Sequence, residues 1–88
     1  MKRYMIKRKL PNVSKATATE LRATVEASNA ALKQLGSDIQ WVESFIIDDH
    51  SHCIYLARDE DIIHEHGKLS GIPVGEINEI HRILTPIG

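Results

Sequence analysis

Residues 39–47 constrain the fold most, because as a strand they would be apolar on both faces. Side chains of a strand alternate between the two faces of a sheet. One face would carry Ile39, Trp41, Phe45 and Ile47, and the other Val42 and Ile46. An antiparallel sheet with one face in water has polar residues on that face. Both faces of this sheet therefore need cover, and a second copy of the chain is the simplest source.

The order of elements follows from periodicity and end signals. Alternation predicts strands at residues 3–9, 39–48, 52–57 and 77–85. The capping-box sequence Thr17-Ala18-Thr19-Glu20 starts a helix that Gly36 ends. The acidic residues 59–61 favour the start of a second helix, which ends before Gly71. Strand, helix, strand, strand, helix, strand is the ferredoxin-like order.

We therefore predict one α+β domain over residues 1–88, with a ferredoxin-like βαββαβ fold and an antiparallel four-stranded sheet. Right-handed crossovers place both helices on one face of that sheet. The other face is predicted to pack on a second copy, which gives a homodimeric α/β barrel. Trp41, Phe45 and Ile47 would anchor this interface, each stabilising it by roughly 1.5–3 kcal/mol.

Composition argues against several classes of partner. The net charge of −1 gives no reason to expect nucleic acid. The basic residues near the N-terminus, Arg8 among them, alternate with apolar ones as on the water-facing side of a strand. No run resembles a signal peptide or a membrane span. The single cysteine, Cys53, fits a reducing compartment, so we expect a cytoplasmic protein.

Five side chains with chemical potential fall, by strand alternation, on the face assigned to the barrel interior. They are Trp41, Glu43, Cys53, Tyr55 and His81. Polar groups in an apolar cavity suit a ligand or a metal. The alternative is that Tyr55 and Glu43 pair with each other or with the partner chain, while Cys53 is a small buried hydrophobe.

His66 is a second candidate, because it shares a helical stripe with Ile62 and Leu69. His64 lies about 200° away around the helix and cannot join His66 at one metal ion. A histidine alone on an apolar stripe is more often a hydrogen-bonded structural residue.

Residues 48–53 hold the densest set of metal donors. His50 and His52 are two residues apart and share a strand face, so together they can bind Zn²⁺, Ni²⁺ or Cu²⁺ if the turn brings their rings together. Turns are also commonly rich in Asp, His and Ser with no metal present.

The hairpin carries a resemblance to a known family. Residues 39–45, Asp48-Asp49 and residues 53–57 are its most specific part. Further matches are Arg3-Tyr4, Leu10-Pro11, Thr19-Glu20-Leu21, Leu35-Gly36, Glu65-His66 and Gly71-Ile72-Pro73. On these residues the chain resembles a small bacterial family of nickel-binding, nickel-responsive proteins, long catalogued as a domain of unknown function.

The resemblance implies a ferredoxin-like protomer, a dimeric barrel, a cytoplasmic setting and Ni²⁺ binding in some members. The residues that match by position are Trp41, Glu43, Ser44, Asp49, Cys53, Tyr55, Glu65 and His66. Among them, Glu43, Cys53, Tyr55 and His66 have side chains able to ligate or orient a metal.

Three functions stay open at this point. The favoured one is a metal-binding or metal-responsive protein that uses Ni²⁺, or else Zn²⁺ or Cu²⁺, held by His66, Cys53 and Glu43 or by the hairpin histidines. The second is a small-molecule enzyme (an isomerase, cyclase or cofactor-free monooxygenase) with Tyr55 or His66 as acid or base. The third is a non-catalytic ligand-binding or interaction module, in which Trp41 and Tyr55 would contact a small apolar ligand. A metal needs donors within ~2.0–2.3 Å of one point, whereas an enzyme needs a cavity of about 300 Å³ or more.

Overall fold

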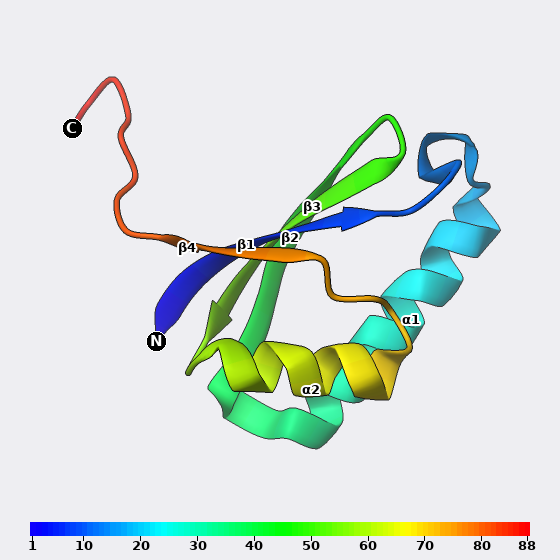
Figure 1. The fold of residues 1–88 in the computed structure, drawn as a ribbon, viewed down its shortest axis with the longest axis horizontal. Helices are drawn as coiled ribbons and strands as arrows, with labels where there is room; N and C mark the ends of the chain where they lie inside the picture. Colours follow the sequence, from blue (N-terminus) through cyan, green and yellow to red (C-terminus); the bar gives the residue numbers. More distant parts are fainter.

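The computed structural model describes all 88 residues, Met1–Gly88. The strands β1 (Lys2–Lys9), β2 (Ile39–Ile47), β3 (His50–Ala57) and β4 (Glu76–Ile80) form one antiparallel sheet in the order β2-β3-β1-β4. Helix α1 (Ala18–Leu35) links β1 to β2, and helix α2 (Glu60–Ser70) links β3 to β4 (Figure 1). The short 3-10 turns η1 (Val13–Lys15) and η2 (Gly36–Asp38) flank α1. The predicted ferredoxin-like βαββαβ fold is confirmed. Neither α1 nor α2 combines the length and the hydropathy that a membrane-crossing helix requires.

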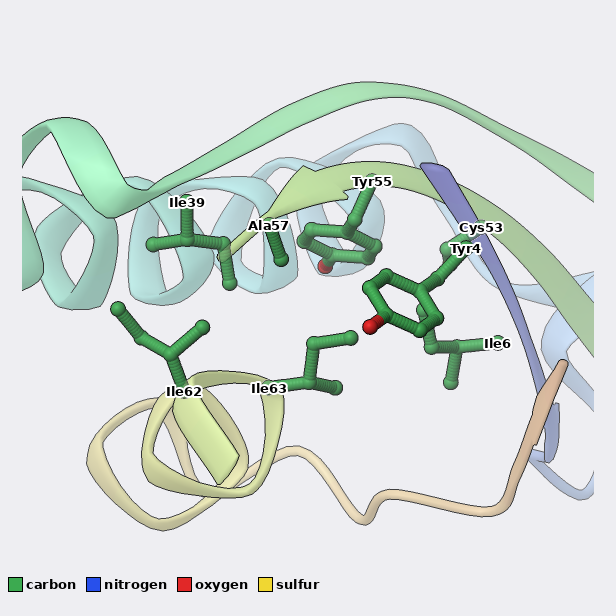
Figure 2. Packing of buried hydrophobic residues seen from close by; sticks show 8 residues of the cluster. All are labelled: Tyr4, Ile6, Ile39, Cys53, Tyr55, Ala57, Ile62 and Ile63. Atoms are coloured by element: carbon green, nitrogen blue, oxygen red, sulfur yellow. The ribbon is translucent and has the colours of Figure 1, made fainter. Parts of the chain in front are cut away.

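Both helices lie on the same side of the sheet, as Figure 1 shows. The core between them and the strands consists of Tyr4, Ile6, Ile39, Cys53, Tyr55, Ala57, Ile62 and Ile63. In Figure 2 the two isoleucines of α2 project toward the side chains of the strands. Each large apolar side chain buried here stabilises the fold by roughly 1.5–3 kcal/mol.

The helix ends form as their sequence signals predict. The Thr17 hydroxyl accepts a hydrogen bond from the Glu20 backbone N–H at 3.1 Å, and the Glu20 carboxylate accepts one from the Thr17 N–H at 3.2 Å. The Asp59 carboxylate accepts from the Ile62 N–H at 3.0 Å and starts α2. Gly71, at φ 73°, ends it.

A β-bulge at Val42 divides strand β2. Trp41 pairs with Tyr55, but Glu43 pairs with Ile54, so Val42 is an extra residue with no partner on β3. The bulge reverses the alternation beyond this point. Phe45 and Ile47 therefore face away from the helices, on the opposite side of the sheet from Trp41. The prediction that these three residues share one face was wrong, because strict alternation cannot register an inserted residue.

The face predicted for Trp41, Cys53 and Tyr55 was also wrong. Cys53 is 5% exposed and Tyr55 is 2% exposed, and both pack beneath the helices rather than on the uncovered face. Strand β3 is apolar on both faces, so its sequence alone could not decide which face meets the helices. Glu43 does lie on the uncovered face. His81 follows the end of β4, which stops at Ile80 instead of reaching residue 85.

The uncovered face of the sheet carries an apolar patch. The register of the strands places Met5, Phe45, Ile47, Ile54, Leu56 and Ile80 on it. Phe45 is 49% exposed and Ile47 is 56% exposed. Both faces of β2 thus carry apolar side chains, as predicted, although the residues on each face differ from those expected. That a second copy covers this face stays a prediction.

The connection from α2 to β4 lies in close contact with the backbone near the end of β1. Gly75 lies against the carbonyl oxygen of Lys7 so closely that a Cβ atom has no room. Pro73, two residues earlier, is held over the same end of β1 by a hydrogen bond from Arg8. The position of this loop is therefore fixed by backbone contact.

Candidate functional site

A cavity of about 250 Å³ lies between the first half of α1 and the sheet. Its apolar walls are Leu10, Leu21, Val25, Trp41, Cys53, Tyr55 and Ile72, and its polar residues are Arg8, Thr24, Ser28, Ser44 and Ser51. The second half of α1 packs on the core through Leu32 and Leu35. Leu21 and Val25, in contrast, are each 37% exposed, so the first half of α1 covers the cavity without sealing it.

Arg8 is the only formally charged residue that lines the cavity, and its side chain is buried. Its Nε donates to the Pro73 carbonyl at 2.6 Å, and its Nη1 donates to Cys53 Sγ at 3.2 Å. Its Nη2 is buried with no hydrogen-bond partner. No carboxylate forms an ion pair with it. A buried cation is normally paired, so this guanidinium is exceptional.

The expectation that Arg8 faces water was wrong. Tyr4, Ile6 and Arg8 lie on the same face of β1, toward the helices. The sequence did contain a signal for this burial, since Arg8 follows Tyr4 and Ile6 at the two-residue spacing of one strand face. It was obscured by the basic residues around it, since Lys7 and Lys9 do lie on the uncovered face.

His66 is fully buried beside the cavity rather than in its wall. Its Nε2 lies 3.1 Å from Ser28 Oγ and 3.3 Å from the Ser28 carbonyl oxygen. A carbonyl only accepts, so this network assigns the ring hydrogen to Nε2. Nδ1 then carries a free lone pair, and it is buried without a partner.

Burial lowers the pKa of His66, and the charge of Arg8 lowers it further, while the hydrogen bond with the Ser28 backbone opposes both. The imidazole is therefore neutral at neutral pH. The contacts of His66 are those of a structural residue, which is one of the two interpretations given above. Its hydrogen bond joins α2 to α1, and its ring packs against the ring of Tyr55, whose centroid is 5.5 Å away.

Tyr55 and Trp41 form one wall of the cavity. Burial raises the pKa of the Tyr55 phenol, although the nearby Arg8 partly opposes this, so the phenol stays protonated at neutral pH. Trp41 donates from Nε1 to Ser44 Oγ at 2.9 Å, across the bulge. The wall thus presents hydroxyl groups within an apolar surface.

The predicted metal ligands do not gather at one point. Cys53 lies beside Arg8, His66 lies in the core, and Glu43 lies on the opposite face of the sheet. No group of three or more His, Cys, Asp or Glu side chains in the protomer is arranged to hold a metal ion.

The hairpin histidines do come together. His50 and His52 lie on the uncovered face of β3, with ring centroids 6.4 Å apart. Asp49 Oδ1 lies 3.0 Å from His50 Nδ1, which leaves His50 Nε2 free. A carboxylate on one ring nitrogen is the usual way in which a metal-binding histidine is oriented.

A family model described as "Nickel responsive protein SCO4226-like" matches residues 4–80. The chain belongs to this family. The crystal structure of SCO4226 from Streptomyces coelicolor A3(2) superposes on the chain with a TM-score of 0.77 and 13% sequence identity, covering 93% of this chain and 99% of that one. At this identity the likeness shows the shared fold. No curated protein sequence matches the chain significantly. The resemblance to nickel-responsive proteins is confirmed at the level of the family.

In this member of the family, the interior residues Cys53 and His66 suit a divalent ion less well than the hairpin residues His50 and His52 do. The Arg8 guanidinium contacts Cys53, and its charge already disfavours a proton on His66. The same charge opposes a dication at either residue. The hairpin pair offers two half-buried imidazoles, ligands that suit Ni²⁺, on the uncovered face of the sheet.

Proposed function

We propose that this chain binds Ni²⁺, or a divalent ion of similar preference, through His50 and His52. The observation that carries the proposal is the placement of both imidazoles on one strand face, with Asp49 orienting the first. Membership of a nickel-responsive family supports nickel as the ion. His66, Cys53 and Glu43 stay predicted ligands, ranked lower because the first two lie near Arg8 and the third lies apart from them.

We further propose that two copies pack their uncovered faces together as a homodimer. The exposed side chains of Phe45 and Ile47 support this, since exposed apolar patches mark interaction sites. His50 and His52 lie on the same face as this patch. Two imidazoles leave coordination positions open on the metal, and water or the second copy would fill them.

Isothermal titration of the metal-free, tag-free protein with Ni²⁺ tests the metal proposal. We expect His50→Ala/His52→Ala to lower the Ni²⁺ affinity by at least about tenfold, because both proposed ligands are lost. The matched control is His64→Ala/His81→Ala, which removes two exposed imidazoles elsewhere and should leave the affinity unchanged. Full binding by the hairpin variant would overturn the proposal. Loss of binding in His66→Ala alone would move the site to the interior.

The enzymatic alternative stays a prediction. The cavity limits which residue would act as acid or base and how large a substrate would be. Tyr55 lines the cavity, whereas His66 does not. Tyr55 is therefore the better placed of the two predicted acid–base residues. The volume of about 250 Å³ lies slightly below the range of ordinary substrate pockets, so any bound molecule is small.

A further inference from the structure

We propose that the cavity between α1 and the sheet binds a small organic monocarboxylate with an apolar body, and that Arg8 binds its carboxylate group. This inference concerns the helix-covered side of the sheet and is independent of the metal site proposed on the uncovered side. It rests on the charge, burial and contacts of Arg8 and on the chemistry of the walls around it.

The first argument is the missing counter-charge. Arg8 is 3% exposed, no carboxylate pairs with it, and no Asp or Glu lines the cavity. Its contacts with the Pro73 carbonyl and Cys53 use only part of its five donors, and Nη2 has no partner. An isolated buried cation is costly, and an anionic ligand would remove that cost.

The second argument concerns the number of charges on the ligand. Arg8 is the one formal charge in the wall, so a ligand with a single negative charge neutralises the site. A phosphate dianion would leave an excess charge among apolar side chains, where charge is poorly tolerated. A planar carboxylate also matches the donor geometry of a guanidinium.

The third argument concerns the body of the ligand. Beyond Arg8 the walls are mainly apolar, with Leu21, Val25, Trp41 and Tyr55 prominent among them. A volume of about 250 Å³ equals that of about eight water molecules at ~30 Å³ each. A ring or short chain of six to eight carbons would fill such a space.

The cation is also held in place before any ligand arrives. The hydrogen bond to Pro73 fixes one side of the guanidinium, and the contact with Cys53 fixes another. The ring of Tyr55 lies 5.9 Å from the guanidinium carbon. A preorganised charge loses little conformational freedom when it binds an anion.

The test is titration of the protein with hexanoate, benzoate and phenylacetate, each compared with its uncharged amide. We expect at least one carboxylate to bind, at least about tenfold more tightly than its amide, because a charged hydrogen bond is lost in the amide. Inorganic phosphate should compete at least about tenfold more weakly than that carboxylate. In Arg8→Met the preference for carboxylate over amide should disappear, while Ni²⁺ binding stays unchanged.

Equal affinity for a carboxylate and its amide would overturn the proposal, as would the absence of binding by all three acids. A second variant guards against misfolding of Arg8→Met. Arg8→Lys keeps the charge but lacks the paired donors, and we expect it to weaken carboxylate binding by about tenfold while retaining the preference over the amide. A wild-type protein that binds a carboxylate but not Ni²⁺ would refute the proposed function and leave the carboxylate proposal standing.

Discussion

At the scale of single residues, His66 joins the two helices through a hydrogen bond between its buried ring and Ser28. Its Nε2 reaches Ser28 of α1 from α2, and both residues are buried. Burial and the charge of Arg8 lower its pKa, so protonation is disfavoured in the folded state. The unfolded state has no such restriction and takes up a proton near pH 6.5.

Acidification should therefore destabilise the fold. Between pH 7.5 and 5.0 the unfolded chain binds more protons at His66 than the folded chain does, so the free energy of unfolding falls as the pH falls. Urea unfolding at a series of pH values measures this. We expect His66→Gln to show a weaker pH dependence than the wild type, and the exposed control His64→Gln to retain it. Identical profiles in all three proteins would show that His66 is not the group responsible.

Arg8 should contribute little to stability, in spite of its burial. An unpaired buried charge carries a desolvation cost, which its replacement by an apolar residue of similar length removes. Pro73 is exposed, so its carbonyl can bind water once the guanidinium is removed. We expect the free energy of unfolding of Arg8→Met to lie within about 1 kcal/mol of the wild type or above it. Ile6→Ala, on the same face of β1, should cost about 2–5 kcal/mol by the same measurement. A comparable loss in Arg8→Met would assign Arg8 a structural role.

At the scale of elements, the helix ends were predictable because their signals are local. The capping box of Thr17 and Glu20 and the glycines after each helix act over a few residues and form as the sequence indicates. The bulge at Val42 was not predictable, because nothing in β2 marks one residue as extra until β3 pairs with it. The strand faces, and with them the composition of the cavity, depend on that pairing.

The capping box offers a test of α1. Thr17→Ala removes the side-chain acceptor for the Glu20 N–H and should lower the free energy of unfolding by about 1 kcal/mol. Thr19→Ala is the matched control, since Thr19 is also exposed, lies in the first turn and takes no part in the cap. Its stability should equal or exceed that of the wild type, because alanine favours a helix. Equal losses in the two variants would contradict the assigned cap.

At the scale of the whole molecule, one side of the sheet is covered by helices and the other is not (Figure 1). Phe45 and Ile46 are neighbours with similar exposure, 49% and 41%, on opposite faces of β2. If two copies pack through the uncovered face, Phe45→Asp should yield monomers in sedimentation velocity, while Ile46→Asp should not. Trp41→Ala, expected from the sequence to break the interface, should leave association unchanged, since Trp41 faces the cavity. A monomeric wild type would refute the dimer.

The segment that contains Gly75 links two events, the pairing of β4 with β1 and the placement of the Arg8 side chain in the cavity. Strand β4 pairs with β1 directly after Gly75, where the chain lies against the backbone of Lys7 with no room for a Cβ atom. The same connection contains Pro73, whose carbonyl accepts the hydrogen bond from Arg8. A chain whose last strand has not docked therefore lacks the Pro73 contact and holds the guanidinium through Cys53 alone. Any carboxylate bound there would shift the equilibrium toward the docked state and protect the segment that follows α2 from proteases. A protein with its cavity filled should therefore lose this segment to proteolysis more slowly than one with its cavity empty.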